Sequence, residues 1–448
     1  MAFDRPWRKA MLPWLMTAVS CLTPGDPAMG DPVPRVPALD IPAAAEDVGP
    51  MGILSRWRDL QRRMADRGVS LHVTDVDEFW AFPTGGGQSS NAYLGATTVE
   101  LDFDPGRLTG QALGRLEVSM MDIRGRPFSN VPLYAFNQTS SIEADDNLRL
   151  YELAYSRSFL DSRLSLRIGK LDLGQDFTAS TYAQTFLNSS FSWPIMPSND
   201  LYAQGPSAPL ATPAVRLRYH PGQAWTFLLG VGDDNPVGAR HFINPDDPWN
   251  QNQDPGGTRF SFRTGALIMT EIQYRTRIGG RTGTYRIGDY VDTGRFPDQM
   301  DTTRLHRTNW AVYVVGDQTL YRMGNRQELD GFVRGNWTGA QDRNQVVYGI
   351  DAGVLLRGPF GRPGDAVGLG FGMGAASPLL RRADRAAGLP GQGREYHLEL
   401  TYTVQVTSWM AVQPDLQGLI EPSGGVLDTA GRRVGNAAIF GLHSSVAF

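Results

Sequence analysis

The sequence has few of the features that would place it in several common classes of protein. Its one cysteine, Cys21, excludes an intrachain disulfide framework and any zinc site built from cysteines. No run of about 18 apolar residues is present, which argues against a helical membrane protein. The mean hydropathy of -0.29 is too polar for that class as well. A net charge of -4 also argues against a nucleic-acid-binding surface.

What the sequence does contain is alternation with a period of two, seen clearly in its last residues, Ala437–Phe448. Phe440, Leu442, Val446 and Phe448 share one parity, whereas small and polar residues occupy the other. This pattern predicts a β-strand. An open strand edge is not tolerated in lipid, so we expect this segment to close a β-barrel in the outer membrane. Taken alone, it also fits an amphipathic strand of a soluble β-protein.

Segments of about ten residues with the same alternation recur from Val69 onward. About ten residues is the length that a tilted strand needs to cross a bilayer, so the sequence predicts an all-β, antiparallel transmembrane barrel of about sixteen strands. The predicted strands are 69–82, 92–103, 111–122, 147–158, 163–172, 213–220, 223–232, 264–276, 282–292, 308–320, 328–337, 346–356, 365–374, 395–406, 409–420 and 437–448.

The connections between these segments alternate between short and long. Membrane barrels have tight periplasmic turns and extended outer loops, so this alternation favours the barrel and places both termini in the periplasm. The connection Leu173–Thr212, about forty residues with several prolines, is too long for a simple turn. We expect it to fold inward and narrow the pore.

The residues before the barrel fall into three predicted parts. A basic start, a short apolar run and small residues favour a signal peptide over residues 1–30, although Cys21 fits the pattern of a lipidated cysteine poorly. Residues 31–50, rich in Pro and Ala, are expected to be a linker. The apolar stripe in residues 51–68 predicts an amphipathic helix that packs on the periplasmic mouth, with binding to a membrane surface as the alternative. Residues 69–448 form the predicted outer-membrane barrel.

Parity also separates lipid-facing from lumen-facing residues. A charge at the lipid midplane costs about 2–4 kcal/mol, so the charged parity is expected to face the lumen of a water-filled channel. For each charged candidate, membership in a salt bridge on the wall is an equal alternative to solute contact. The aromatic candidates could instead form interfacial girdles. The lumen candidates for substrate binding are Glu152, Arg167, Arg216, Arg218, Asp317 and Arg334, with Trp80 and Trp193 as stacking platforms.

Similarity to a known family lies in segments 150–155, 163–172, 186–191, 283–288, 292–294, 317–322 and 412–417. Together these segments resemble the carbohydrate-selective porin family of Gram-negative outer membranes, the OprB family. The resemblance covers nearly all of residues 52–448. It implies passive, substrate-selective diffusion of sugars, often glucose-type monosaccharides, and commonly a homotrimer embedded in outer-membrane lipid and lipopolysaccharide. Family members often have Trp-Gly-Gly near the start of the helix, where this chain has Gly52-Ile-Leu.

Other functions remain open at this stage. The predicted lumen arginines suit an anion or sugar-acid porin as well as a sugar porin. An outer-membrane enzyme would need a nucleophile and a base that converge, and His443 beside two serines on one strand is only adjacency. Asp233-Asp-Asn235 could bind calcium in an outer loop, but no twelve-residue calcium loop is present. We therefore expect no catalytic residues, no cofactor and no metal.

Overall fold

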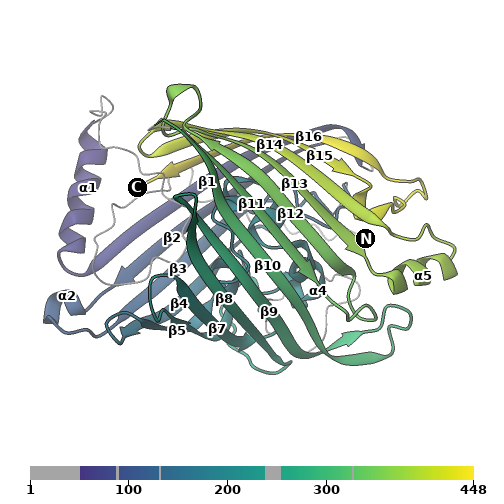
Figure 1. The fold of residues 1–448 in the computed structure, drawn as a ribbon, viewed down its shortest axis with the longest axis horizontal. Coiled ribbons are helices and arrows are strands. Elements are labelled where there is room, and N and C mark those ends of the chain that lie inside the picture. The colour runs from purple at the N-terminus through teal and green to yellow at the C-terminus, as the bar shows by residue number, and fades with distance from the viewer. Residues whose placement is uncertain (1–50, 87–89, 131–132, 238–253, 325–326) are drawn as a thin grey trace, which may run out of the picture.

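The chain forms one closed barrel of sixteen antiparallel strands in a computed structural model (Figure 1). The structure describes residues 51–86, 90–130, 133–237, 254–324 and 327–448. Each strand pairs with its neighbours in sequence, which confirms the predicted fold. The strands are β1 Val69–Gly86, β2 Ser90–Phe103, β3 Arg115–Gly125, β4 Asn147–Phe159, β5 Leu164–Leu171, β6 Thr212–Tyr219, β7 Trp225–Asp233, β8 Ala266–Ile278, β9 Arg281–Pro297, β10 Leu305–Met323, β11 Gln327–Trp337, β12 Val346–Arg357, β13 Ala366–Ala376, β14 Arg394–Thr407, β15 Met410–Ile420 and β16 Gly435–Ala447.

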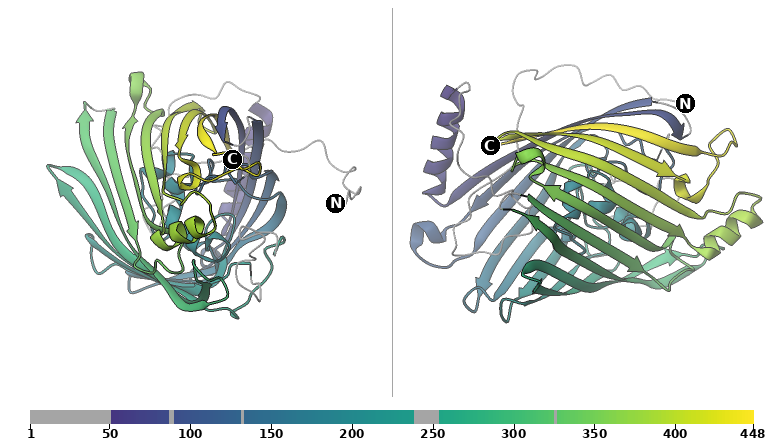
Figure 2. Two further views of the ribbon diagram at one scale, coloured as in Figure 1. Left: turned by 90° about the vertical axis from the view of Figure 1, so that its right-hand side faces the viewer. Right: turned by 45° about the horizontal axis from the view of Figure 1, so that its top comes forward.

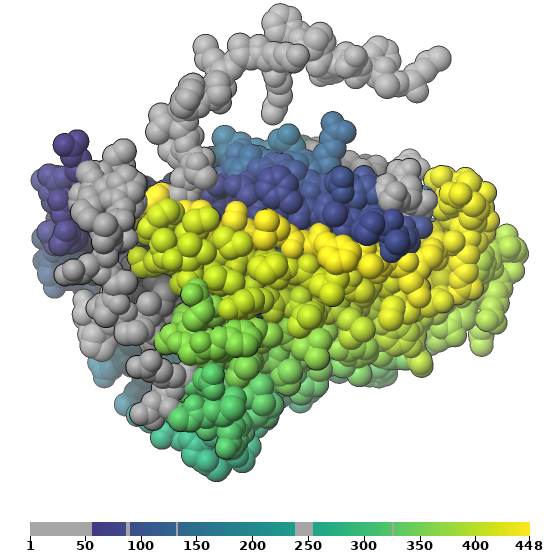
Figure 3. Space-filling model, turned by 90° about the horizontal axis from the view of Figure 1, so that it is seen from above, coloured from purple at the N-terminus to yellow at the C-terminus, as the bar shows by residue number. Residues whose placement is uncertain are grey.

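The last strand closes the barrel by pairing with the first. In the register of β1 with β16, Thr74 lies opposite Ala447 and Phe79 lies opposite Leu442. The first strand therefore runs directly beside the last one on the barrel surface (Figure 3). Closure supplies both ladders of hydrogen bonds for every strand, so no strand edge faces lipid. The role predicted for the C-terminal segment is confirmed.

The two faces of the wall differ as the alternation predicts. Phe79 and Leu442 point outward, with 58% and 46% of their surface exposed, and many other large apolar residues share this face. Their neighbours Glu78 and His443 point inward, where His443 Nδ1 lies 2.9 Å from Glu78 Oε1. The outward parity is thus mainly apolar and available to lipid, and the inward parity is mainly polar.

The two ends of the barrel carry different connections. Helices α1, Met51–Ala65, and α2, Gly106–Thr109, lie at the same end as the C-terminus, and helix α5, Pro378–Ala386, lies at the other (Figure 1). The end with α1 and the short turns corresponds to the predicted periplasmic side, and the long connections lie at the opposite end. Among the described residues, no helix is both long and apolar enough to span a membrane. The predicted signal peptide and linker lie outside the described residues.

Helix α1 contacts the wall beside the start of β1. Gln61 Nε2 donates to the carbonyl of Leu71 at 3.1 Å, and Arg107 donates to the carbonyl of Ala65 at 3.2 Å. Leu60 keeps 41% of its surface exposed. The helix is therefore attached to the periplasmic rim, but it is not buried there.

Some predicted boundaries are wrong. Strand β9 continues to Pro297 and strand β10 already begins at Leu305, because the two strands stay paired beyond the predicted ends. Strand β3 begins at Arg115 rather than Gln111, since α2 and the turn after it occupy the preceding residues. Helix α5 was not predicted, although the Ser377 side chain caps it by accepting from the Leu379 amide.

The opposite faces of β16 give a direct test of the wall. Replacing Leu442 by arginine places a charge in lipid, so we expect the free energy of unfolding to fall by about 2–4 kcal/mol. The matched control is His443→Arg, which places the same side chain one residue away, beside Glu78 on the wet face. Urea unfolding in lipid vesicles measures both, and equal losses for the two variants would contradict the assignment of the faces.

Candidate functional site

Two long connections fold into the barrel rather than away from it. One joins β3 to β4 through the described residues 126–130 and 133–146, and the other joins β5 to β6 over residues 172–211. Their coils lie inside the ring of strands when the barrel is viewed along its axis (Figure 2, left). We call these the first and second inward segments. The second contains η1 Leu173–Gln175, η2 Ala183–Thr185, α3 Ser189–Ser192, α4 Ile195–Asp200 and η3 Tyr202–Gln204.

Carboxylates on the inner wall hold the second inward segment by its backbone. Glu399 of β14 accepts from the amides of Leu187 and Asn188 at 2.7 and 2.9 Å. Glu271 of β8 accepts from the amide of Thr178 at 3.1 Å. A buried amide without a partner costs stability, so these carboxylates satisfy groups that a sheet would otherwise have to satisfy. The prediction that Leu173–Thr212 folds inward is confirmed.

Glu395 of β14 holds the first inward segment in the same way. Its two oxygens accept from the amides of Phe136 and Asn137 at 2.7 and 3.1 Å, and Oε2 also accepts from the amide of Ser423 at 2.7 Å. One carboxylate on the wall therefore joins an inward segment to the connection between β15 and β16. Because all three donors are backbone groups, the side chain of Phe136 is available to pack in a buried apolar cluster.

Asp317 and Arg334, two of the predicted lumen residues, both contact the second inward segment. Asp317 accepts from the Ser180 hydroxyl at 2.6 Å and from the Thr181 amide at 3.0 Å. Arg334 forms a 3.0 Å ion pair with Asp351 and donates to the carbonyls of Thr178 and Ser190. These two residues therefore attach the segment to β10 and β11.

Arg216 and Arg218 both pair with Asp176 of the second inward segment. The distances are 3.1 Å from Arg216 Nε and 2.6 Å from Arg218 to the two carboxylate oxygens. Arg167 pairs with Glu152 at 3.0 Å, beside this contact on the wall. All six charged candidates are at most 6% exposed and all six form ion pairs or hydrogen bonds with the protein. Their positions therefore agree with the alternative that these residues are salt-bridged parts of the wall.

The two tryptophan candidates lie in packed apolar clusters. Trp80 is 2% exposed, donates from Nε1 to Glu78 at 2.8 Å and lies near Phe128 of the first inward segment. Trp193 is 5% exposed and donates to the carbonyl of Gln204 at 2.8 Å. Neither ring offers a free face to a passing solute in this arrangement, because neighbouring side chains cover both.

Glycines on the inner face of β13 make room for the second inward segment. A Cβ atom on Gly370 would lie 2.7 Å from the ring of Phe191, and one on Gly374 would lie 2.1 Å from Ile195. Both distances are shorter than carbon atoms can approach one another. The alternating glycines of residues 368–374 therefore leave the space in which this segment packs against the wall.

Burial also changes the chemistry of the first inward segment. Burial raises the pKa of Glu143 to about 7, opposed by the hydrogen bonds that its carboxylate accepts. Those bonds come from the Ser129 hydroxyl at 2.6 Å and from the Phe128 and Ser129 amides at 2.7 Å. The segment is thus organised around an acid and lies inside the barrel, whereas the alternation of short and long connections predicts an outer loop here. Its signal was apolar residues such as Phe128 and Phe136 within a polar stretch.

The barrel with its anchored inward segments matches a family model described as "Carbohydrate-selective porin, OprB family" over residues 88–448. The chain belongs to the carbohydrate-selective porin family. It is accordingly a porin of the Gram-negative outer membrane, and the resemblance inferred from its motifs is confirmed.

Similar proteins agree with this family. Porin B of Pseudomonas aeruginosa is 23% identical over 446 residues, which cover 90% of this chain and 93% of that protein. The putative porin QuiX of Acinetobacter baylyi is 22% identical over 83% of this chain and 89% of that protein. The high-pH structure of Pseudomonas putida OprB shares the fold with a TM-score of 0.76 at 21% identity, over 88% of this chain and 97% of that one.

Removing one wall carboxylate tests the anchoring of the second inward segment. Glu399→Ala leaves the amides of Leu187 and Asn188 without an acceptor, so we expect the segment to loosen and the single-channel conductance to rise and fluctuate. Glu421→Ala is the control, because it removes only an exposed ion pair with Arg433, which contributes little. Unchanged conductance in the Glu399 variant, with the control also unchanged, would contradict this role.

Proposed function

We propose that the porin lets neutral monosaccharides of the glucose type diffuse passively into the periplasm. The observation that carries this proposal is the pairing of the interior charges. Arg167, Arg216, Arg218 and Arg334 each lie within 3.1 Å of a carboxylate oxygen. An anion channel needs cations whose charge is not neutralised locally, whereas sugar hydroxyls need closely spaced donors and acceptors. Because these charges are paired, they leave little net field in the interior, which supports a neutral solute over an anion or a sugar acid.

We further propose that Tyr182 of the second inward segment is the aromatic surface that contacts the sugar. Its ring is partly exposed, unlike those of Trp80 and Trp193. Its hydroxyl lies 3.0 Å from Thr319 Oγ1, and the Arg357 guanidinium lies 5.9 Å from the ring centroid. An aromatic face beside a fixed guanidinium combines stacking on a sugar ring with hydrogen bonding to its hydroxyls.

The sugar proposal predicts that reconstituted liposomes swell faster in glucose than in non-sugar solutes of matched size, and that added glucose reduces the current across planar bilayers. Strong anion selectivity with no effect of glucose would overturn it. Tyr182→Ala should weaken block by glucose about two- to tenfold, the amount that aromatic contacts contribute. Tyr321→Ala, on the outward face of β10 with 56% exposure, is the control. A response to glucose that is unchanged in Tyr182→Ala would remove that residue alone from the proposal.

The quaternary state that we propose is a homotrimer in contact with outer-membrane lipid. The support is a charged cluster on the outward face of β1–β3. Arg124 pairs with Asp75 at 2.8 Å, with Asp77 at 3.2 Å and with Asp122 at 3.6 Å. On β2, the outward residues Tyr93 and Phe103 are separated by about the length of one membrane crossing. Thr97 lies between them, and it is the residue opposite Asp75 on β1 and opposite Asp122 on β3. Charges at this depth avoid lipid, so a neighbouring subunit is the expected cover.

Oligomer size tests this proposal. We expect native mass spectrometry of the detergent-purified porin to give three chains. Replacing Asp75 and Asp122 together by leucine removes two acids from the outward face and should shift the distribution away from trimers. Replacing Tyr274, an outward residue on the remote strand β8, by leucine should not. A monomer in both the wild type and the control would contradict the trimer and leave the sugar proposal intact.

A further inference from the structure

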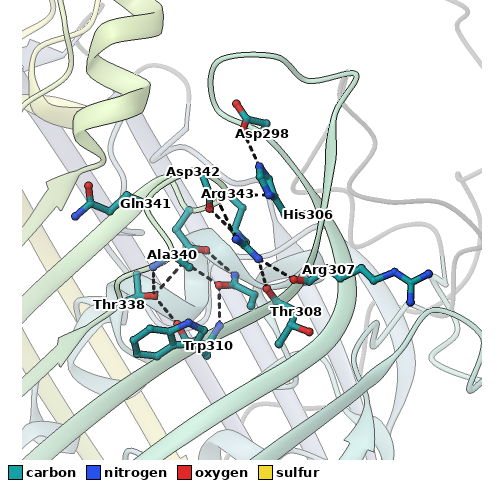
Figure 4. Close-up of polar contacts among 12 residues, drawn as sticks. Asp298, His306, Arg307, Thr308, Trp310, Thr338, Ala340, Gln341, Asp342 and Arg343 are labelled. Atoms are coloured by element: carbon teal, nitrogen blue, oxygen red, sulfur yellow. Dashed lines mark hydrogen bonds and ion pairs between the residues drawn. The ribbon is translucent and has the colours of Figure 1, made fainter.

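Three residues that the sugar pathway does not use meet in the outer connections. Asp298 directly follows β9, His306 is the second residue of β10, and Asp342 lies between β11 and β12. Figure 4 shows the imidazole of His306 between the two carboxylates. One potential ligand atom from each residue lies within 4.8 Å of the others. Two connections that are distant in sequence are therefore joined at a single histidine.

The Asp298 carboxylate is oriented before it meets the histidine. Its Oδ1 accepts from the amides of Met300 and Asp301 at 2.7 and 3.1 Å. This leaves Oδ2 for His306 Nε2, at 2.6 Å. A carboxylate at that distance accepts a hydrogen bond from the ring. In the neutral imidazole, Nε2 therefore carries the proton and Nδ1 carries the lone pair.

The lone pair on His306 Nδ1 faces a second acceptor. Asp342 Oδ2 lies 3.5 Å away, longer than an ordinary hydrogen bond. Two facing acceptors repel each other unless a proton or a metal cation lies between them. Two ligands on one tetrahedral zinc ion, with bonds of about 2.0–2.2 Å, are separated by about 3.3–3.5 Å. The observed separation fits that value without rearrangement of the backbone.

Asp342 is itself held in place. Arg343 donates from Nε to Oδ1 at 2.8 Å and from Nη2 to Oδ2 at 3.2 Å. Arg343 Nη1 also donates to the carbonyls of Arg307 and Thr308, at 2.7 and 2.6 Å. The carbonyl of Asp342 accepts from the amide of Gln299 at 2.7 Å, which joins the two connections by their backbones as well. The two facing ligand atoms are thus fixed from both sides, although the charge of Arg343 weakens the attraction for a cation.

We propose that this cluster is a binding site for a divalent zinc-type ion at the outer mouth of the porin. His306 Nδ1 and Asp342 Oδ2 are the protein ligands, and water completes the coordination. Asp298 is a positioning residue that fixes the tautomer and the ring, as carboxylates behind metal-bound histidines do. The ion links the connection after β9 to the connection after β11. The site is independent of the sugar pathway, because none of its residues belongs to the inward segments.

The test is calorimetric titration of the full-length porin, purified in detergent without a histidine tag and stripped with a chelator, using zinc chloride. We expect saturable binding of one ion per chain. His306→Gln should abolish it or weaken it at least about tenfold, and Asp298→Asn should weaken it roughly 10- to 100-fold while leaving both ligands present. His220→Gln, in the turn between β6 and β7, is the matched control and should bind as the wild type does.

Folding of every variant is checked by heat-modifiable mobility on gels. X-ray absorption at the zinc edge of the wild-type porin provides a readout that needs no variant, and a nitrogen and oxygen shell with one imidazole is expected. Absence of saturable binding would overturn the proposal. Equal affinity in the wild type and in His306→Gln would overturn it as well.

Discussion

The interior of this porin depends on carboxylates that project from the β-barrel wall and accept hydrogen bonds from the backbone amides of the two inward segments. A closed barrel satisfies its own amides, but a segment that crosses its lumen has none of those partners. Glu395, Glu399 and Glu271 supply them from the wall, and Asp200 supplies them in the reverse direction by accepting from the amides of Gln345 and Val346. The shape of the channel is therefore fixed by hydrogen bonds between side-chain carboxylates and backbone amides, made in both directions between the wall and the inward segments.

This arrangement assigns the charged residues of the lumen two tasks at once. Those at the edge of the inward segments, such as Asp317 and Arg334, are used to hold them. Those nearer the periplasmic turns, such as Arg357, keep part of their surface exposed while they pair with Asp330 at 2.6 Å. Selectivity and structure thus draw on one set of neutralised pairs, which suits a channel for uncharged hydroxyl-rich solutes better than a channel for ions.

Most of the fold could be predicted from the sequence because a transmembrane barrel repeats one local rule. The parity that places Leu442 outside and His443 inside needs no long-range information, and it located all sixteen strands. The residues of the inward segments could not be placed in this way. Whether Glu399 contacts solute or two amides depends on the path of residues 172–211, about 200 positions away in sequence. The glycines of β13 looked like part of an ordinary strand because their purpose lies in the volume of Phe191 and Ile195.

These glycines have a consequence for how such channels can diversify. Where the wall consists of glycine, only its backbone limits how closely the inward segment can approach. Any methyl group added at Gly370 or Gly374 must therefore be matched by a smaller side chain on that segment. Changes in bore can thus be made as compensated pairs of apolar substitutions, with the ionic contacts left as they are. The width of the channel and the charges that line it can therefore change independently of each other.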